Sequence, residues 1–171
     1  RCTIAGPDGE LALSIPTVKP DTLKCPMKDI RISDHGNWRH LHWNAIESAY
    51  NNTPFFEYYK DDFRPFYEKK YEFLIDFNEE ICRLVCQLID IQPNIERTSA
   101  YKMEFSAEET DFRESIHPKK DFRTTDPEFS PQPYYQVFES KLGFLPNLSI
   151  IDLLFNMGPE SLLVLKKPTR L

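Results

Sequence analysis

A tryptophan and a histidine one helical turn apart are the first residues here whose types and spacing suggest catalysis. Trp38 and His42 lie four positions apart, which places them on one face of a helix. A half-buried histidine beside an indole ring can have a shifted pKa and act as a general base. The structural alternative, which the sequence favours, is a histidine hydrogen-bonded at the edge of the core. His40 lies about 200° around the helix axis from His42, so the two cannot chelate one metal ion unless the helix is broken.

A carboxylate inside an apolar helix is the second candidate. Asp152 and Asn156 lie four positions apart in the otherwise apolar stretch 150–156. A buried carboxylate is costly unless it is paired. Asp152 therefore either takes part in a site, or forms a structural ion pair or caps a neighbouring helix, and the sequence leaves both open.

Three weaker patterns favour structural roles. The segment 53–59 carries four aromatic rings in five positions, which can stack on a sugar but more often pack in a core. Arg113 can bind a carboxylate or phosphate, although a surface ion pair with Asp111 is the simpler account. Cys82 and Cys86 lie four positions apart without further ligands at a zinc spacing. We expect them to be buried, reduced thiols and predict no metal site.

The first half of the chain predicts a hairpin followed by helices. Alternating residues around Gly6-Pro7-Asp8-Gly9 predict a β-hairpin over 2–16, and 30–32 predicts a further short strand. Apolar periodicity predicts a helix over about 38–50. A second helix is expected to start with Thr53 as its N-cap.

Further helices and one strand are expected in the middle of the chain. The pattern predicts a helical stretch from about 61 to 74 and an amphipathic helix with Asp76 as its N-cap that Pro93 closes. Alternation over 95–105 predicts a strand with no strongly apolar face.

The C-terminal part begins with a loop. The charged, proline-containing stretch 108–133 is expected to be a loop. Ser149 is expected to cap a helix over 150–156 that Gly158-Pro159 ends, and 162–165 is expected to be a closing strand. The predicted fold class is α+β, a mostly helical mixed domain with a small, partly antiparallel sheet.

Composition excludes several classes of protein. The 171 residues fit one domain, and the net charge of 21 − 27 = −6 disfavours general nucleic-acid binding. No apolar run approaches the roughly 20 residues of a membrane span. The chain has no glycine-rich phosphate loop, serine-hydrolase elbow or zinc-protease motif, and no cofactor is predicted. Four cysteines in 171 residues are too few for a disulfide framework, so reduced thiols in a cytoplasmic protein are expected.

Two motifs carry a resemblance to a known family. The first runs from Trp38 through His42 and Tyr50 to Pro54-Phe55-Phe56, and the second lies within 135–158 around Asp152-Leu153-Leu154-Phe155-Asn156. Together with the hairpin they resemble the WbqC-like family of bacterial proteins. Relative to that family, residues 1–171 are expected to form a single WbqC-like domain that lacks an N-terminal segment. If that segment completes the sheet, the exposed edge favours a homo-oligomer.

The resemblance implies a role in making bacterial surface polysaccharides of the O-antigen type. Family members are thought to transfer glycine or another amino acid to an amino sugar such as perosamine. In an aminoacyl or acyl transferase of this kind, His42 is the expected base and Asp152 orients it or holds the sugar amine. The expected substrate-binding residues are Trp38, Tyr135, Gln136 and Asn156, through ring stacking and hydrogen bonds to the oxyanion.

A non-catalytic module that binds a glycan intermediate or a protein partner is the alternative. In that case Trp38, His42, Asp152 and Asn156 form a structural polar network between two helices. The two hypotheses differ in whether His42 and Asp152 meet beside an open pocket.

Overall fold

A computed structural model describes residues 1–22, 25–117, 120–125 and 129–166. The chain divides into two compact units. One comprises residues 1–92 together with the chain from Pro133 onward, and the other comprises 93–132. The predicted fold class is confirmed, because the described residues are mostly helical and include a two-stranded antiparallel sheet. None of the described helices is both long and apolar enough to cross a bilayer.

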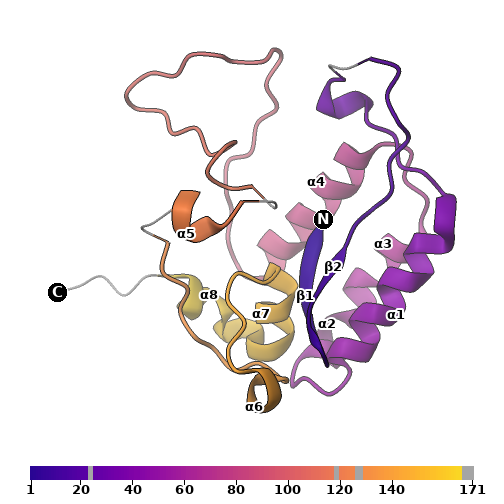
Figure 1. Cartoon of the computed structure of the whole chain (residues 1–171), viewed down its shortest axis with the longest axis vertical. Coiled ribbons are helices and arrows are strands. Elements are labelled where there is room, and N and C mark those ends of the chain that lie inside the picture. The colour runs from indigo at the N-terminus through magenta and orange to yellow at the C-terminus, as the bar shows by residue number, and fades with distance from the viewer. Residues whose placement is uncertain (23–24, 118–119, 126–128, 167–171) are drawn as a thin grey trace. The chain divides into compact units, whose positions relative to one another are not determined.

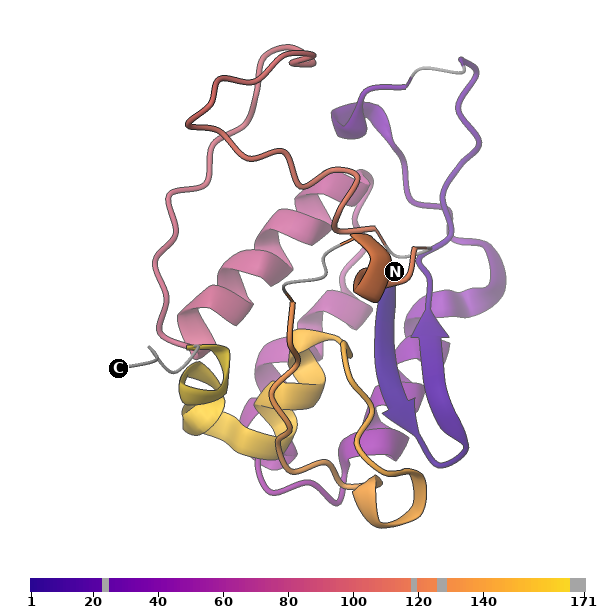
Figure 2. The same cartoon turned by 60° about the vertical axis from the view of Figure 1, so that its left-hand side comes forward.

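The predicted hairpin is present at the start of the first unit. Strands β1 (Cys2–Gly6) and β2 (Gly9–Leu13) pair antiparallel, with Gly6 opposite Gly9 across a two-residue turn. Gly9 adopts a φ of +122°, which only glycine tolerates readily and which explains its place after Asp8. Figure 2 shows the two strands side by side.

Helix α1 (Trp38–Tyr50) has the predicted bounds and contacts β1. A 3₁₀ turn, η2 (His35–Asn37), leads into it. The prediction that Thr53 caps the next helix is wrong, because its hydroxyl donates to the Tyr50 carbonyl at 2.7 Å and so closes the end of α1. Helix α2 (Phe56–Phe63) starts further on.

The predicted helix over 61–74 is wrong in its extent. Helix α2 ends at Phe63, and the short α3 (Pro65–Glu68) begins with proline, which has no N–H to continue the previous helix. The residues between α3 and α4 are not helical and pair with 30–32, since Ile32 N–H donates to the Glu72 carbonyl and Leu74 N–H donates to the Ile30 carbonyl, each at 2.9 Å. The expected strand over 30–32 therefore consists of isolated bridges.

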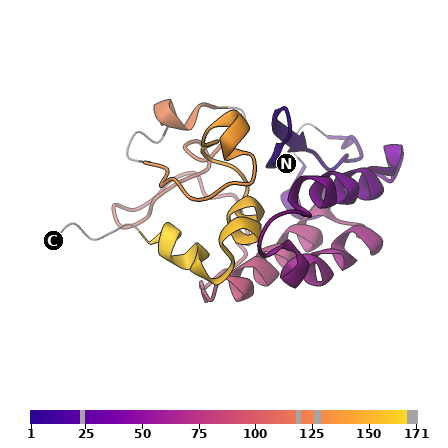
Figure 3. The same ribbon diagram turned by 90° about the horizontal axis from the view of Figure 1, so that it is seen from below.

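Helix α4 (Leu74–Leu88) is the predicted amphipathic helix, with an earlier start. The expected N-cap Asp76 lies inside the first turn, where its negative charge interacts favourably with the helix dipole. The helix ends before Ile89, so Pro93 does not close it directly. Figure 3 shows the hairpin on one side of α1 and α4 on the other.

The regular elements described in the C-terminal part of this unit are all helices or helical turns. Helix α6 (Glu139–Leu142) precedes α7 (Ile150–Met157), which follows Ser149 as predicted and contacts β1. After the 3₁₀ turn η3 (Gly158–Glu160), residues 161–165 form α8 (Ser161–Leu165). The predicted strand over 162–165 is therefore wrong.

Two clusters of apolar side chains form the core of the first unit. Phe155 lies at the centre of the larger one, with its ring centroid 5.1–5.3 Å from those of Tyr50, Phe56 and Phe63. Hairpin, α1, α2 and α7 meet there, as Figure 1 shows. The smaller cluster joins α1, α3 and the start of α4; its buried members are Ile32, Trp38, Phe66, Tyr71 and Phe77.

The second unit has little regular structure among its described residues, with one short helix, α5 (Phe122–Thr125). The predicted strand over 95–105 is wrong, because this segment forms no strand and bends at residues 99–100. The Arg113 guanidinium pairs with Asp111 at 2.7 Å, as expected. It also lies over the rings of Tyr101 and Phe105, 4.6 and 4.8 Å from their centroids.

Candidate functional site

Asp152 is completely buried and accepts three hydrogen bonds from protein side chains. The hydroxyl groups of Tyr50 and Tyr134 donate to its two carboxylate oxygens, each at 2.7 Å. The side-chain amide of Gln136 donates to Oδ2 at 3.1 Å. These donors come from the end of α1 and from the segment before α6, so the carboxylate of α7 joins three parts of the fold.

Gln136 and Asn156 extend this network into the backbone. The Gln136 side chain donates to the Leu145 carbonyl and accepts from the Leu145 N–H, each at 2.9 Å. The Asn156 oxygen accepts from Val137 N–H at 3.1 Å, and its nitrogen donates to the Asp152 carbonyl at 2.7 Å. Both amides are only 2% exposed, so their polar groups are occupied by the protein itself.

Burial controls the ionisation of this network. Loss of hydration raises the pKa of Asp152, against the three hydrogen bonds, which favour the ionised carboxylate. Burial, together with the charge of Asp152, also raises the pKa of the Tyr50 and Tyr134 hydroxyls. Both phenols are therefore neutral donors at neutral pH.

The raised pKa of Asp152 predicts a stability difference that depends on pH. The folded protein holds this proton more tightly than the unfolded chain does, so the contribution of Asp152 to stability falls as pH rises from about 4 to the folded pKa. We expect the unfolding free energy of wild type relative to Asp152→Asn to decrease across that window. Urea titrations at matched pH values measure it, and a difference that rises with pH would contradict the burial effect.

His42 and Trp38 lie in a separate aromatic cluster. Their ring centroids are 5.2 Å apart, and both rings face Tyr67 at 6.5 Å. Burial lowers the pKa of His42, partly offset by a hydrogen bond to the Ser14 backbone, so the imidazole is neutral at pH 7. The Trp38 indole donates to the Ser33 carbonyl at 3.1 Å.

The structure brings the expected site residues together in two groups. Asp152 lies with Gln136 and Asn156, and His42 lies with Trp38. No hydrogen bond joins His42 to Asp152 in the described part of the chain. Tyr50, the Asp152 partner on α1, lies eight residues beyond His42, which is about 12 Å along the helix. Tyr135 belongs to neither group and is 51% exposed.

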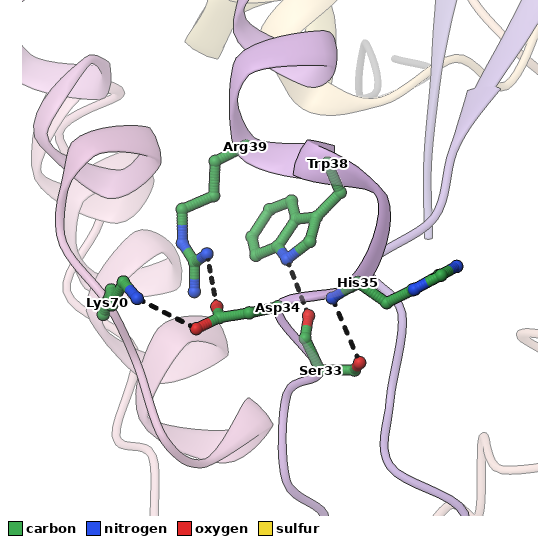
Figure 4. Close-up of polar contacts among 6 residues, drawn as sticks. All are labelled: Ser33, Asp34, His35, Trp38, Arg39 and Lys70. Carbon is green, nitrogen blue, oxygen red and sulfur yellow. Dashed lines mark hydrogen bonds and ion pairs between the residues drawn. The ribbon is translucent and has the colours of Figure 1, made fainter.

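Two cationic side chains, Arg39 and Lys70, share the carboxylate of Asp34 close to Trp38, as Figure 4 shows. Asp34 accepts from Arg39 at 2.6 Å and from Lys70 at 3.1 Å, so one carboxylate holds two cations. The Arg39 guanidinium also lies 4.8 Å from the Trp38 ring centroid. Among the described residues, its Nε–H is the one buried side-chain polar group that lacks a partner.

Lys70 also lines a pocket of about 320 Å³, here called the α4 pocket. The α4 pocket lies where the segment before α4 meets the first turns of that helix. Its lining consists of Lys69, Lys70, Tyr71, Glu72, Asp76, Glu79, Glu80 and Arg83. Three cations face four carboxylates, so the lining carries one net negative charge.

Glu80 is held in the α4 pocket by two neighbouring side chains. It accepts from the Tyr71 hydroxyl at 2.6 Å and from Lys69 at 3.1 Å, and these bonds lower the pKa of Glu80. The Lys69 ammonium also lies 4.4 Å from the Tyr71 ring centroid. Sequence reasoning missed this site, because charges spaced along an amphipathic helix are also typical of a solvated face. The adjacent Lys69-Lys70-Tyr71 and Glu79-Glu80 were the available signal.

No cluster of three or more His, Cys, Asp and Glu side chains suited to a metal ion occurs among the described residues. The α4 pocket is a concave, polar candidate site for a small ligand, whereas the Asp152 network is internal to the fold.

Comparison with known proteins identifies the family. No curated protein and no solved structure matches the chain. A model of the WbqC-like protein family matches residues 1–117, a stretch that holds His42 and the α4 pocket and stops before the motif around Asp152. Because this stretch is more than half of the 171 residues, the chain belongs to the WbqC-like protein family.

Proposed function

We propose that this WbqC-like protein binds an amino-sugar intermediate of bacterial surface-polysaccharide synthesis in the α4 pocket. The observation that carries the proposal is the mixture of charges in a cavity of about 320 Å³. This volume falls within the range of about 300–1,000 Å³ typical of small-molecule sites. A sugar offers hydroxyl groups that donate and accept, and Lys69, Lys70 and Arg83 can donate to them.

The amine of the sugar is the feature that the α4 pocket suits best. A protonated amine is a cation, and the lining carries one more carboxylate than it has cations. Glu80 is held ionised, and Lys69 is the one donor to its Oε1 among the residues that the structure describes, so this oxygen can take a further donor. The bond to an ammonium group is charge-assisted and roughly twice as strong as a neutral one.

Replacing Glu80 by glutamine tests this binding mode. We expect Glu80→Gln to weaken perosamine binding roughly 10- to 100-fold, because a charged hydrogen bond is lost. Titration calorimetry measures the affinity for perosamine and for the matched sugar with a hydroxyl in place of the amine. Glu57→Gln makes the same charge change in an exposed ion pair on α2 and serves as the control.

The outcomes distinguish binding of the sugar at Glu80 from attraction of the sugar by the net charge of the protein. Wild type should prefer the amino sugar, Glu57→Gln should retain that preference, and Glu80→Gln should lose it. Equal weakening in both variants would show that net charge attracts the sugar, and it would contradict a site at Glu80.

Aminoacyl transfer is the second candidate, and the neutral state of His42 favours it. Attack by the sugar amine on an activated acyl group requires removal of a proton, and a histidine with a lowered pKa is an unprotonated base at pH 7. The Asp152 carboxylate is completely buried and accepts three hydrogen bonds from protein donors, which supports a structural role for it. In this proposal His42 acts without Asp152.

Replacing His42 by alanine tests the transfer reaction. We expect turnover of a glycyl donor with perosamine to fall about 10²- to 10⁴-fold, since a general base contributes that much. Mass spectrometry of the product measures turnover, and near-ultraviolet circular dichroism checks that the aromatic cluster around Trp38 is intact. A folded His42→Ala variant with wild-type turnover would remove His42 as the base.

The proposal places the protein in the cytoplasm. All four cysteines are free thiols, which fits a reducing compartment. Self-association remains part of the proposal because the solvent-facing side of β2 includes Leu11, which is 42% exposed.

A further inference from the structure

Cys82 and Cys86 form a pair of thiols on one face of α4. The prediction that both are buried is wrong for Cys82, which is exposed, and Cys86 is partly exposed. The two residues lie four positions apart on α4, which places their side chains on one face of the helix. Burial and the neighbouring Cys82 raise the pKa of Cys86. Two soft donor atoms thus lie together on the surface, and neither residue lines the α4 pocket.

Helix geometry disfavours a disulfide between these thiols. Cβ atoms four residues apart on a helix are about 5–6 Å from each other. A disulfide requires about 3.5–4.5 Å between them. Direct oxidation would therefore distort α4, whereas an atom that bridges the sulfurs would not. Two metal–sulfur bonds of about 2.3 Å in line span roughly 4.6 Å between sulfur atoms.

The donor set selects the kind of ion. Thiolates prefer soft cations, and Cu(I) is the common soft cation that two thiolates can satisfy. A structural zinc ion needs four ligands, and the described residues offer no His, Cys, Asp or Glu cluster that completes such a set. We propose that Cys82 and Cys86 bind one Cu(I) ion as a two-coordinate bis-thiolate on the exposed face of α4.

The reaction is balanced without a redox step. Both thiols release their protons to solvent, two sulfur–copper bonds form, and copper remains Cu(I): Cu⁺ + 2 RSH gives [RS–Cu–SR]⁻ + 2 H⁺. The other cysteines lack a matching arrangement. Cys2 lies on β1 beside Ser149, and the Cys25 thiol donates to the Pro26 carbonyl at 3.5 Å.

Cu(I) retention against a competing chelator tests this site. The full chain is loaded anaerobically with Cu(I), and a chromogenic Cu(I) chelator is added at a concentration that strips single thiols. Wild type and Cys25→Ser should each retain one equivalent of copper. Cys82→Ser and Cys86→Ser should each lose the bound copper. Each variant keeps only one thiolate of the pair, so solvent would have to supply the second ligand of the ion.

A variant that keeps the number of thiols but breaks their spacing provides the matched control. Cys86→Ser combined with Gln87→Cys places the two thiols five residues apart, about 140° around the helix. Gln87 is exposed, so the exchange leaves the core unchanged. This double variant should also lose its one equivalent of copper. Retention of copper by the double variant or by either single serine variant, or its loss in Cys25→Ser, would overturn the site.

Discussion

Replacing Asp152 by alanine should lower the unfolding free energy by at least about 3 kcal/mol, because three donors lose their acceptor. The carboxylate is 0% exposed, and it accepts bonds from Tyr50, Tyr134 and Gln136. Each buried donor left unpaired costs about 1–3 kcal/mol, and a cavity adds to that. Urea unfolding followed by circular dichroism measures the loss.

Two further variants control for this interpretation. Tyr134→Phe removes one of the three bonds at the more exposed side and keeps the ring contact with Phe144, so it should cost only about 1 kcal/mol. Asp152→Asn keeps the volume but turns an NH₂ donor toward other donors, so its cost should lie between the two. A loss of less than about 1 kcal/mol in Asp152→Ala would mean that this network does not stabilise the fold.

Replacing Gly158 by alanine should have the second large effect, a loss of about 3 kcal/mol. Gly158 adopts a φ of +54° and a ψ of −128°, a sparsely populated conformation that costs other residues roughly 1–3 kcal/mol. A Cβ atom there would also lie 2.5 Å from the Phe55 ring, and overpacking of this kind adds about 1–3 kcal/mol. Thermal and urea unfolding measure the effect.

Gly143→Ala is the matched control for the contact with Phe55. Gly143 also has a positive φ, +70°, but a Cβ atom there meets nothing within 4 Å. Its substitution should therefore cost only the backbone strain, about 1–3 kcal/mol, without the added overpacking. Equal losses at the two glycines would mean that Phe55 moves aside freely and that the close packing at the end of α7 contributes nothing.

Local signals explain why part of the fold could be predicted from the sequence. The Pro-Asp-Gly turn specifies the hairpin, and regular apolar spacing specifies α1. The stretch 61–74 could not be predicted in the same way, because its last residues pair with 30–32 and tertiary hydrogen bonds override helical spacing. The run 162–165 was ambiguous because short apolar segments suit both strands and helices.

The candidate site was predictable only in part for a similar reason. The sequence singled out Asp152 as a carboxylate that needs partners, and it has them. It could not indicate Tyr50, which lies 102 positions away and is brought close by the packing of α1 against α7. The α4 pocket depends on how the segment before α4 turns into the helix, and no local pattern encodes that turn.

A structure of the protein with bound perosamine tests the central claim most directly. We expect the sugar in the α4 pocket, with its amine within hydrogen-bonding distance of a Glu80 carboxylate oxygen. A sugar bound instead beside the His42 and Trp38 rings, with the α4 pocket empty, would contradict the claim.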